Sequence, residues 1–272
     1  MSGPVLTVRN LTVDYLVDPV VHAVRNVDLT LARGEILGLA GESGCGKSTL
    51  AYAIVRLLKP PGAVTSGRVL TGDVDWGSLH AEELRAARWD RVSMVFQGAM
   101  NSLNPVITIG EQLEDVFLTH RPRMSRRERR QRCGDLLERV GVDRARLRSH
   151  PHELSGGMRQ RVMIAMAMAL EPQLMIMDEP TTALDVVVQR EILQEITRLR
   201  DELGFAVLFI THDLPLLLEI SDRIAVMRDG SIVEMSSAVE MYTNPQHPYT
   251  RQLLASFPSL TGARGDFLRA GS

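Results

Sequence analysis

One segment limits the choice of fold more than any other: a short apolar run that leads directly into a glycine-rich stretch. The apolar run covers residues 36–40, and an unbroken run of this length is typical of a strand buried on both faces of a sheet. The stretch that follows, GESGCGKST at residues 41–49, precedes a helical pattern that we expect to continue through Leu58. Pro60-Pro61-Gly62 must end that helix, because proline cannot continue its hydrogen-bond ladder. Strand, turn and helix in this order indicate an α/β protein.

The glycine-rich stretch has the spacing of a phosphate-binding P-loop, Gly41-x4-Gly46-Lys47-Ser48. Glycines let successive backbone N–H groups turn toward phosphate oxygens, and the amino end of the next helix adds partial positive charge. Lys47 is placed to reach the β and γ phosphates and Ser48 to ligate Mg²⁺. A chance glycine turn is the alternative, but only two of the 31 basic residues are lysines and one occupies the required position. We therefore predict a nucleotide site with these residues: Gly41, Ser43, Gly44, Cys45, Gly46, Lys47, Ser48 and Thr49.

A second apolar run, residues 174–177, ends in the acidic pair Asp178-Glu179. Ligands of α/β proteins bind at the carboxyl ends of strands, so Asp178 is placed to hold Mg²⁺. Glu179 is placed to orient or deprotonate the water that attacks a γ-phosphate. An acidic pair can also merely cap a turn, but together with the glycine-rich loop it indicates phosphate chemistry.

Two further strands are expected to end at the same edge, each followed by a polar residue. Gln97 follows a strand that ends in Phe96, and His212 follows one that ends in Ile210-Thr211. A glutamine can hold Mg²⁺ or water and a histidine can donate to a phosphate oxygen. Each would then respond to whether ATP or ADP is bound. Taken singly, either residue is more often an ordinary polar loop group.

The segment Leu154–Gln160, with the sequence LSGGMRQ, precedes a long helical run. Ser155 as N-cap, together with Gly156 and Gly157, would expose several backbone donors at the helix start, which is an anion site. One chain would then carry two phosphate-binding helix ends. Head-to-tail pairing of two subunits explains both, if the loop of each subunit closes over the nucleotide of the other. A capped helix without a ligand is the alternative.

The rest of the sequence gives a coarse outline. The first thirty residues alternate apolar and polar positions, which predicts antiparallel strands and a small β-subdomain. Residues 98–170 are helical in pattern, with a capping box at Ser125 and Glu128 and a stop at Gly141. A helix over residues 186–203 closes at Gly204, and a last short helix follows the break at 244–248. Seven arginines between Arg121 and Arg132 indicate a solvated helix face, or contact with anionic lipid headgroups or an acidic partner.

Composition excludes several classes of protein. A formal charge of −2 and 4% aromatic residues argue against nucleic acid as a partner. No apolar stretch approaches the roughly 18–20 residues of a spanning helix, and the first four residues show no export signal, so we expect a cytosolic protein. Two cysteines, Cys45 and Cys133, fit a reducing compartment. Cys45 stands near a helix amino end, where the pKa of its thiol could be lowered, although a small filler residue is the commoner interpretation.

The motifs together resemble the nucleotide-binding subunit of ABC transporters, in family order, over residues 5–235. They are Gly41–Thr49, Gln97, Leu154–Gln160, Asp178-Glu179, Ala183-Leu184-Asp185 and His212. The resemblance implies an α/β P-loop NTPase (RecA-like) core with an amino-terminal antiparallel β-subdomain and an inserted α-helical subdomain. It also implies that Tyr15 stacks on adenine and that Asp185 links two sites across a dimer. The catalytic set would be Glu179, His212, Gln97 and Lys47, with ATP as substrate and Mg²⁺ held by Ser48, Gln97 and Asp178.

Three segments show a finer resemblance to the oligopeptide, dipeptide and nickel importer ATPases: residues 96–105, 157–165 and 244–250. This resemblance implies an ATP-hydrolysing motor on the cytoplasmic face of the membrane. Its partners would be a second, different ABC ATPase, two transmembrane permease subunits and an external substrate-binding protein, with no nucleic acid. Peptides are the first expected cargo, with oligosaccharides and nickel as alternatives. A soluble ABC ATPase acting on nucleic acid or ribosomes is the alternative class.

We expect one ABC ATPase domain made of four parts. Residues 1–97 would hold the β-subdomain and part of the core, and residues 98–170 the helical subdomain. Residues 171–235 would complete the core, and residues 236–272 would form a carboxy-terminal extension.

Overall fold

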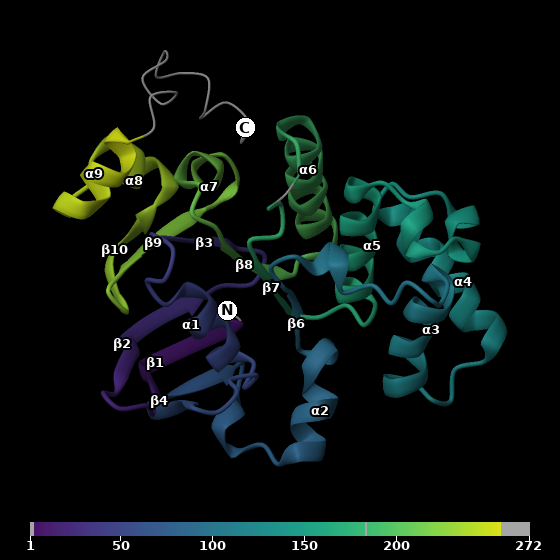
Figure 1. Ribbon diagram of the computed structural model, residues 1–272, viewed down its shortest axis with the longest axis horizontal. Helices are drawn as coiled ribbons and strands as arrows, with labels where there is room; N and C mark the ends of the chain where they lie inside the picture. The colour runs from purple at the N-terminus through teal and green to yellow at the C-terminus, as the bar shows by residue number, and fades with distance from the viewer. Residues whose placement is uncertain (1–2, 183, 257–272) are drawn as a thin grey trace. The chain divides into compact units, whose positions relative to one another are not determined.

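The computed structural model describes residues 3–182 and 184–256, and Figure 1 labels its elements. Residues 3–80 and 206–256 belong to one compact unit, and residues 81–182 and 184–205 to another. The four-part division expected from the sequence stays a prediction. In the described part of the chain, no helix has both the length and the apolar composition needed to cross a membrane.

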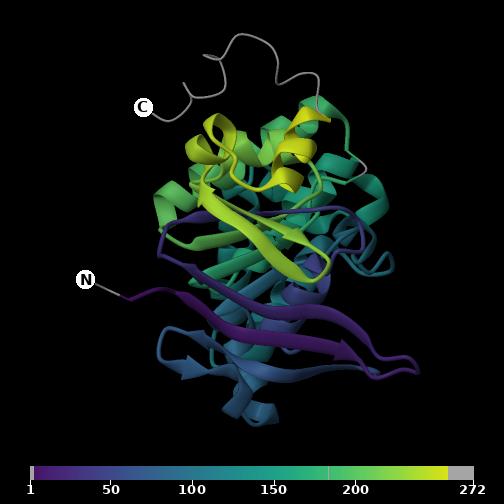
Figure 2. The same ribbon diagram turned by 90° about the vertical axis from the view of Figure 1, so that its left-hand side faces the viewer.

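The first unit contains an antiparallel sheet near the amino terminus. Its strands are β1 (Leu6–Tyr15), β2 (Val21–Leu31), β4 (Gly62–Thr71) and β5 (Val74–Asp75), in the order β2-β1-β4-β5. The long purple and blue strands of Figure 2 are β1, β2 and β4. Leu6 and Val8 are buried alternate residues of β1, and after an irregularity in the pairing the alternation resumes with Leu11 and Val13. The alternation of apolar and polar residues therefore predicted these strands correctly.

A second group of strands in this unit carries the glycine-rich loop. The strand β3 (Ile36–Ala40) pairs in parallel with β8 (Ala206–Ile210) and β9 (Arg223–Arg228), and β10 (Ser231–Ser237) runs antiparallel to β9. All residues of β3 and β8 are buried, as expected for strands covered on both faces. Helix α7 (Leu214–Ile220) packs against β3 and contacts α8 (Ala238–Thr243) and α9 (Pro248–Ala255). The yellow helices α8 and α9 are prominent in Figure 2.

The helix that follows the glycine-rich loop is shorter than predicted. Helix α1 (Lys47–Ile54) has Val55 as its C-cap, and Arg56 has a left-handed φ of 52°. The Arg56 guanidinium donates to the carbonyl oxygens of Trp76 and Leu79, at 2.8 and 2.7 Å, in and just after the turn η1 (Trp76–Ser78). These bonds, together with the left-handed backbone, end the helix before the prolines. The prediction that it continues through Leu58 was wrong.

The second unit combines helices with two parallel strands, β6 (Val92–Val95) and β7 (Leu174–Asp178). Its helices are α2 (Ala81–Asp90), α3 (Ile109–His120), α4 (Arg126–Arg139), α5 (Gly156–Met168) and α6 (Val186–Leu203), with short turns η2 (Ala99–Asn101), η3 (Arg144–Arg148) and η4 (Pro151–Glu153). Helices α3, α4 and α5 pack on one another (Figure 1). The helical pattern of residues 98–170 is thus confirmed.

The predicted helix ends are mostly correct. Helix α6 covers residues 186–203 and ends at Gly204, whose φ of 70° is the left-handed conformation of a glycine C-cap. Gly141, with a φ of 69°, follows α4 as expected. The capping box of α4 is only half formed. The Ser125 hydroxyl accepts from the backbone N–H of Glu128 at 3.2 Å, but the Glu128 carboxylate lies 3.7 Å from Arg132 Nε instead of returning to Ser125.

A glycine in β4 allows a test of how closely β1 and β4 pack. Gly67 lies beside an irregularity in the pairing of β1 with β4 and has a φ of 91°. A Cβ atom there would lie 2.4 Å from the carbonyl oxygen of Asn10 and 2.5 Å from Leu11 Cα. Gly34 has a φ of 70°, but no atom lies within 4 Å of its Cβ position, so it is a matched control for backbone strain alone.

We expect Gly34→Ala to lower the free energy of unfolding by about 1 kcal/mol, because alanine resists a positive φ. Gly67→Ala should cost about 1–3 kcal/mol more, because backbone atoms must also move. Urea unfolding of both variants measures the difference. Equal costs would show that the β1–β4 contact is not tight.

Candidate functional site

A pocket of about 400 Å³ in the first unit surrounds the glycine-rich loop. The loop supplies Glu42, Ser43, Gly44, Cys45 and Gly46, and α1 adds Thr49. Tyr15 lines the same pocket, and its hydroxyl lies 3.2 Å from that of Thr49, in a hydrogen bond that either group can donate. The structure therefore brings Tyr15 beside the loop, as the family resemblance implied. The pocket also takes residues from β2, β9 and α9: His22, Arg25, Arg228, Asp229 and Tyr249 among them.

Two glycines of the loop are required by close backbone contacts. A Cβ atom on Gly41 would lie 2.3 Å from the carbonyl oxygen of Met227, and one on Gly46 would lie 2.3 Å from that of Ala23. Gly46 also has a φ of 111°, which disfavours any residue with a side chain. Gly44 differs, since nothing lies within 4 Å of its Cβ position and only its φ of 81° favours glycine. Strands β2 and β9 thus fix the shape of the loop.

The positive charge of the glycine-rich loop suits a polyphosphate. Lys47 is 6% exposed, and its ammonium donates to the carbonyl oxygens of Gly41 and Glu42, at 2.7 and 2.8 Å. Within residues 3–182 and 184–256, no carboxylate forms an ion pair with Lys47, and no side chain caps the start of α1, where Gly46 is the N-cap. A buried cation that is held by two neutral carbonyls and the Cys45 sulfur, beside an uncapped helix start, attracts anions. The residues present therefore fit a nucleotide with its phosphates on the loop.

The thiol in this loop is not activated. Burial raises the pKa of Cys45 above its usual value, against the opposing effect of the Lys47 ammonium. The interpretation that the helix start lowers this pKa was wrong, since desolvation of the thiolate outweighs the nearby positive charge. Burial likewise raises the pKa of Cys133 to about 12.

The second unit brings together two residues that the sequence identified separately. Strands β6 and β7 are parallel neighbours, so their carboxyl ends lie at the same edge. Gln97 Nε2 donates to Glu179 Oε2 at 3.2 Å, and the Thr182 hydroxyl donates to the same oxygen at 2.9 Å. Asp178, the last residue of β7, is fully buried. Glu179 has a φ of 46°, an uncommon backbone for a residue with a side chain, and such residues cluster at functional sites.

The segment around Ser155 begins a helix as predicted. The Ser155 hydroxyl accepts from the backbone N–H of Met158 at 3.3 Å and caps α5, while Asp185 accepts from the N–H of Val188 at 3.0 Å and caps α6. The two helix starts touch, because a Cβ atom on Gly157 would lie 2.7 Å from Val188 Cγ1. Gly156 is the first residue of α5. Ala183 lies outside the described residues.

The predicted site residues thus fall into two groups, one in each unit. Tyr15, the glycine-rich loop, Ser48 and His212 belong to the first unit, where His212 is exposed between β8 and α7. Gln97, Asp178, Glu179, Asp185 and the segment at Ser155 belong to the second.

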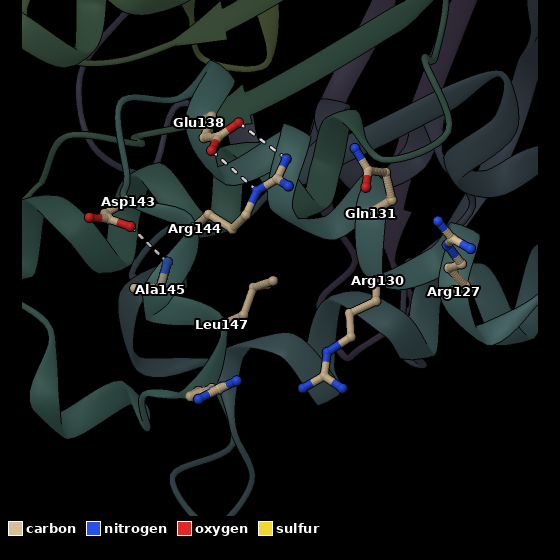
Figure 3. Close-up of a pocket in the computed structure, with 9 residues that line it drawn as sticks. Arg127, Arg130, Gln131, Glu138, Asp143, Arg144, Ala145 and Leu147 are labelled. Atoms are coloured by element: carbon tan, nitrogen blue, oxygen red, sulfur yellow. Dashed lines mark hydrogen bonds and ion pairs between the residues drawn. The ribbon is translucent and has the colours of Figure 1, made fainter.

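The second unit has a larger pocket of about 780 Å³, which the arginine-rich segment lines. Figure 3 shows Arg127, Arg130 and Gln131 on α4, with Arg144 reaching Glu138 from η3. The Asp143 carboxylate accepts from the backbone N–H of Ala145 at 2.7 Å. This pocket has neither a glycine turn nor a strand end, and Arg127 and Arg130 are exposed. It is a solvated basic face, which was one of the interpretations left open by the sequence.

Comparison with known proteins identifies the family. The family described as ABC transporter matches residues 24–182, and the oligopeptide/dipeptide transporter C-terminal region matches residues 233–270. The dipeptide transport ATP-binding protein DppD of Bacillus subtilis is 43% identical, over 94% of this chain and 77% of that protein. The chain belongs to the ABC transporter family. It is therefore an ABC-type ATPase, a protein that binds ATP.

Other relatives agree with this ABC transporter assignment. The glutathione import ATP-binding protein GsiA of Escherichia coli is 42% identical over 97% of this chain, which spans 44% of that longer protein. A solved dimeric bacterial ABC transporter cassette is 32% identical, with a TM-score of 0.76 over 86% of this chain and 98% of that one. A dimeric cassette solved in a post-hydrolysis state with ADP and Pi has a TM-score of 0.75. The predicted fold class is thus confirmed.

Sequence reasoning missed one group of residues around the loop of this ABC cassette. Arg228 and Tyr249 line the pocket, and the Arg228 guanidinium carbon lies 4.8 Å from the centre of the Tyr249 ring. Tyr249 falls in the segment 244–250 that carried the finer family resemblance, but no spacing rule connects it with a loop two hundred residues earlier. Only the pairing of β3 with β9 brings them together.

The raised pKa values of the two cysteines predict how fast each thiol reacts with an alkylating reagent. Because the pKa of Cys45 is raised, a smaller fraction of it is thiolate near pH 7.5, and iodoacetamide should alkylate it more slowly than it alkylates glutathione. Cys133, buried and with a pKa of about 12, should not react in the folded protein. Mass spectrometry of time points at pH 7.5 and 9.5 measures both sites. Alkylation of Cys45 at the glutathione rate at pH 7.5 would contradict the raised pKa.

Proposed function

We propose that this chain is the ATP-hydrolysing motor subunit of a membrane importer of di- and oligopeptides. The observation that carries the motor role is the Gln97–Glu179 hydrogen bond at the ends of adjacent parallel strands, in a chain with a complete phosphate-binding loop. Peptide cargo is supported by the match of residues 233–270 to the oligopeptide/dipeptide transporter region. The names of two relatives, a dipeptide and a glutathione importer protein, also favour peptides over oligosaccharides or nickel.

In this proposal the loop residues Gly41–Thr49 hold the phosphates of ATP, and Lys47 reaches the β and γ phosphates. Tyr15, beside the loop, stacks on adenine. Ser48, Gln97 and Asp178 would hold Mg²⁺, which when bound neutralises charge on the phosphate oxygens. Glu179 accepts a proton from the attacking water, with its carboxylate oriented by Gln97 and Thr182. His212 donates to a γ-phosphate oxygen.

The proposal includes assembly with other subunits. Residues Ser155–Gly157 of one ATPase subunit would close over the nucleotide of the other, and Asp185 would connect the two sites. The partner is a second, different ABC ATPase, and the pair sits on two transmembrane permease subunits at the cytoplasmic face of the membrane. An external binding protein delivers the cargo to the permease. The dimeric form of the similar cassettes supports pairing.

We expect Glu179→Gln to bind ATP about as well as the parent but to hydrolyse it at least about 10²-fold more slowly, because an amide cannot accept the proton. Lys47→Ala should lose ATP binding as well. Glu219→Gln, on an exposed residue of α7, is a matched control that should keep the parent rate. Phosphate release and binding of a fluorescent ATP analogue measure the two effects. Parent-rate hydrolysis by Glu179→Gln would exclude this residue as the base.

Deleting the gene should abolish uptake of a radiolabelled dipeptide by whole cells, because the importer would lose its energy source. The parent gene should restore uptake and the Lys47→Ala gene should not. Parallel uptake of a labelled oligosaccharide and of nickel tests the other cargoes. Normal dipeptide uptake in the deletion strain, together with loss of one of the other two, would reassign the cargo and leave the motor role intact.

A further inference from the structure

The carboxy-terminal helix α9 touches the glycine-rich loop through one side chain. The backbone N–H of Glu42 donates to the phenolic oxygen of Tyr249 at 3.3 Å. Tyr249 is only 4% exposed, and burial raises the pKa of its hydroxyl, so it stays protonated at neutral pH. Glu42 is the second residue of the loop, and a hydrogen bond there holds the peptide unit between Gly41 and Glu42.

Several contacts fix the position of Tyr249. The Glu234 carboxylate of β10 accepts from the backbone N–H groups of Gln246 and His247, at 2.7 and 2.9 Å. His247 Nδ1 then accepts from the backbone N–H of Tyr249 at 3.2 Å and caps α9. The guanidinium of Arg228 covers the Tyr249 ring. The segment 244–250 is therefore arranged so that its tyrosine reaches the loop.

The residue that Tyr249 holds also organises the phosphate-binding groups. The carbonyl oxygen of Glu42 accepts from Lys47 Nζ at 2.8 Å and from the backbone N–H of Cys45 at 3.3 Å. The backbone N–H of Gly230, in the β9–β10 turn, donates to the Cys45 carbonyl at 3.0 Å. Among the described residues after β9, Tyr249 and Gly230 thus both support the loop.

We propose that Tyr249 is a positioning residue that holds the Glu42 peptide and keeps the loop in its phosphate-binding conformation before ATP arrives. Residues 244–250 would then contribute to ATP affinity without contacting the phosphates, because a preordered loop loses less conformational entropy on binding. The inference rests on the proposed binding of ATP phosphates to this loop. It assigns a role to a segment that the motor mechanism leaves unused.

The test is Tyr249→Phe in the full chain, which keeps the ring and its contact with Arg228 but removes the acceptor oxygen. Loss of one hydrogen bond should raise the Kd for ATP about five- to tenfold. In the complex with its partners, KM for ATP should rise by a similar factor while kcat at saturating ATP stays unchanged. Tyr242→Phe, in α8 just before this segment and outside the pocket lining, is the matched control and should leave both constants unchanged.

Amide hydrogen exchange separates this role from a merely structural one. The Glu42 amide should exchange faster in Tyr249→Phe, whereas the amides of β3 and of the interior of α1 should keep the parent rates. Faster exchange throughout the first unit, or a parent Kd with parent exchange at Glu42, would overturn the inference. Failure of the parent protein to bind ATP would instead count against the proposed function, so the two failures are distinguishable.

Discussion

The structure of the nucleotide pocket depends on how closely the backbones of β2 and β9 approach the glycine-rich loop. At Gly41 and Gly46 the position of a Cβ atom is occupied by carbonyl oxygens of Met227 and Ala23. Those carbonyls belong to, or adjoin, strands from opposite ends of the sequence, so the shape of a nine-residue loop is set by the pairing of the whole first unit. The loop is thereby held against the edge of the sheet, and its helix start and Lys47 keep a fixed arrangement.

The same constraint explains which of two basic pockets suits a nucleotide. The larger pocket, lined by α4 and η3, has more arginines, but Arg127 and Arg130 are exposed. The lining carboxylates of Glu138 and Asp143 already pair with Arg144 and with the backbone N–H of Ala145. The loop beside the smaller pocket has one buried ammonium with neutral partners and a helix start with a glycine N-cap. An ion held in a preordered, half-buried site interacts more strongly than one on a solvated face, because water screens the latter. A count of arginines alone would therefore favour the larger pocket over the glycine-rich loop.

Local patterns predicted the elements well where the chain itself sets them. The buried strand at residues 36–40, the helix over 186–203 and its end at Gly204 follow from apolar runs, 3.6-residue periodicity and a left-handed glycine. The Gln97–Glu179 contact followed from a general rule, that parallel strands end at one edge. The end of α1 could not be predicted, because it depends on hydrogen bonds from Arg56 to carbonyl groups 20 and 23 residues later. Helix propensity, which depends on local sequence, takes no account of such a long-range hydrogen bond.

At the candidate site, Tyr249 shows the same limit of prediction from local sequence patterns. Its position depends on a chain of contacts from Glu234 through His247 to Glu42, and the first and last links join residues that are far apart in the sequence. The residues of segment 244–250 have ordinary local roles, since Pro248 starts a helix and His247 caps it. Only when β9 lies beside β3 does α9 meet the loop. The loop of this ABC cassette is thus supported both by the close approach of β2 and β9 and by Tyr249 of α9. A motif that covers only the strand, the loop and the helix contains neither contact.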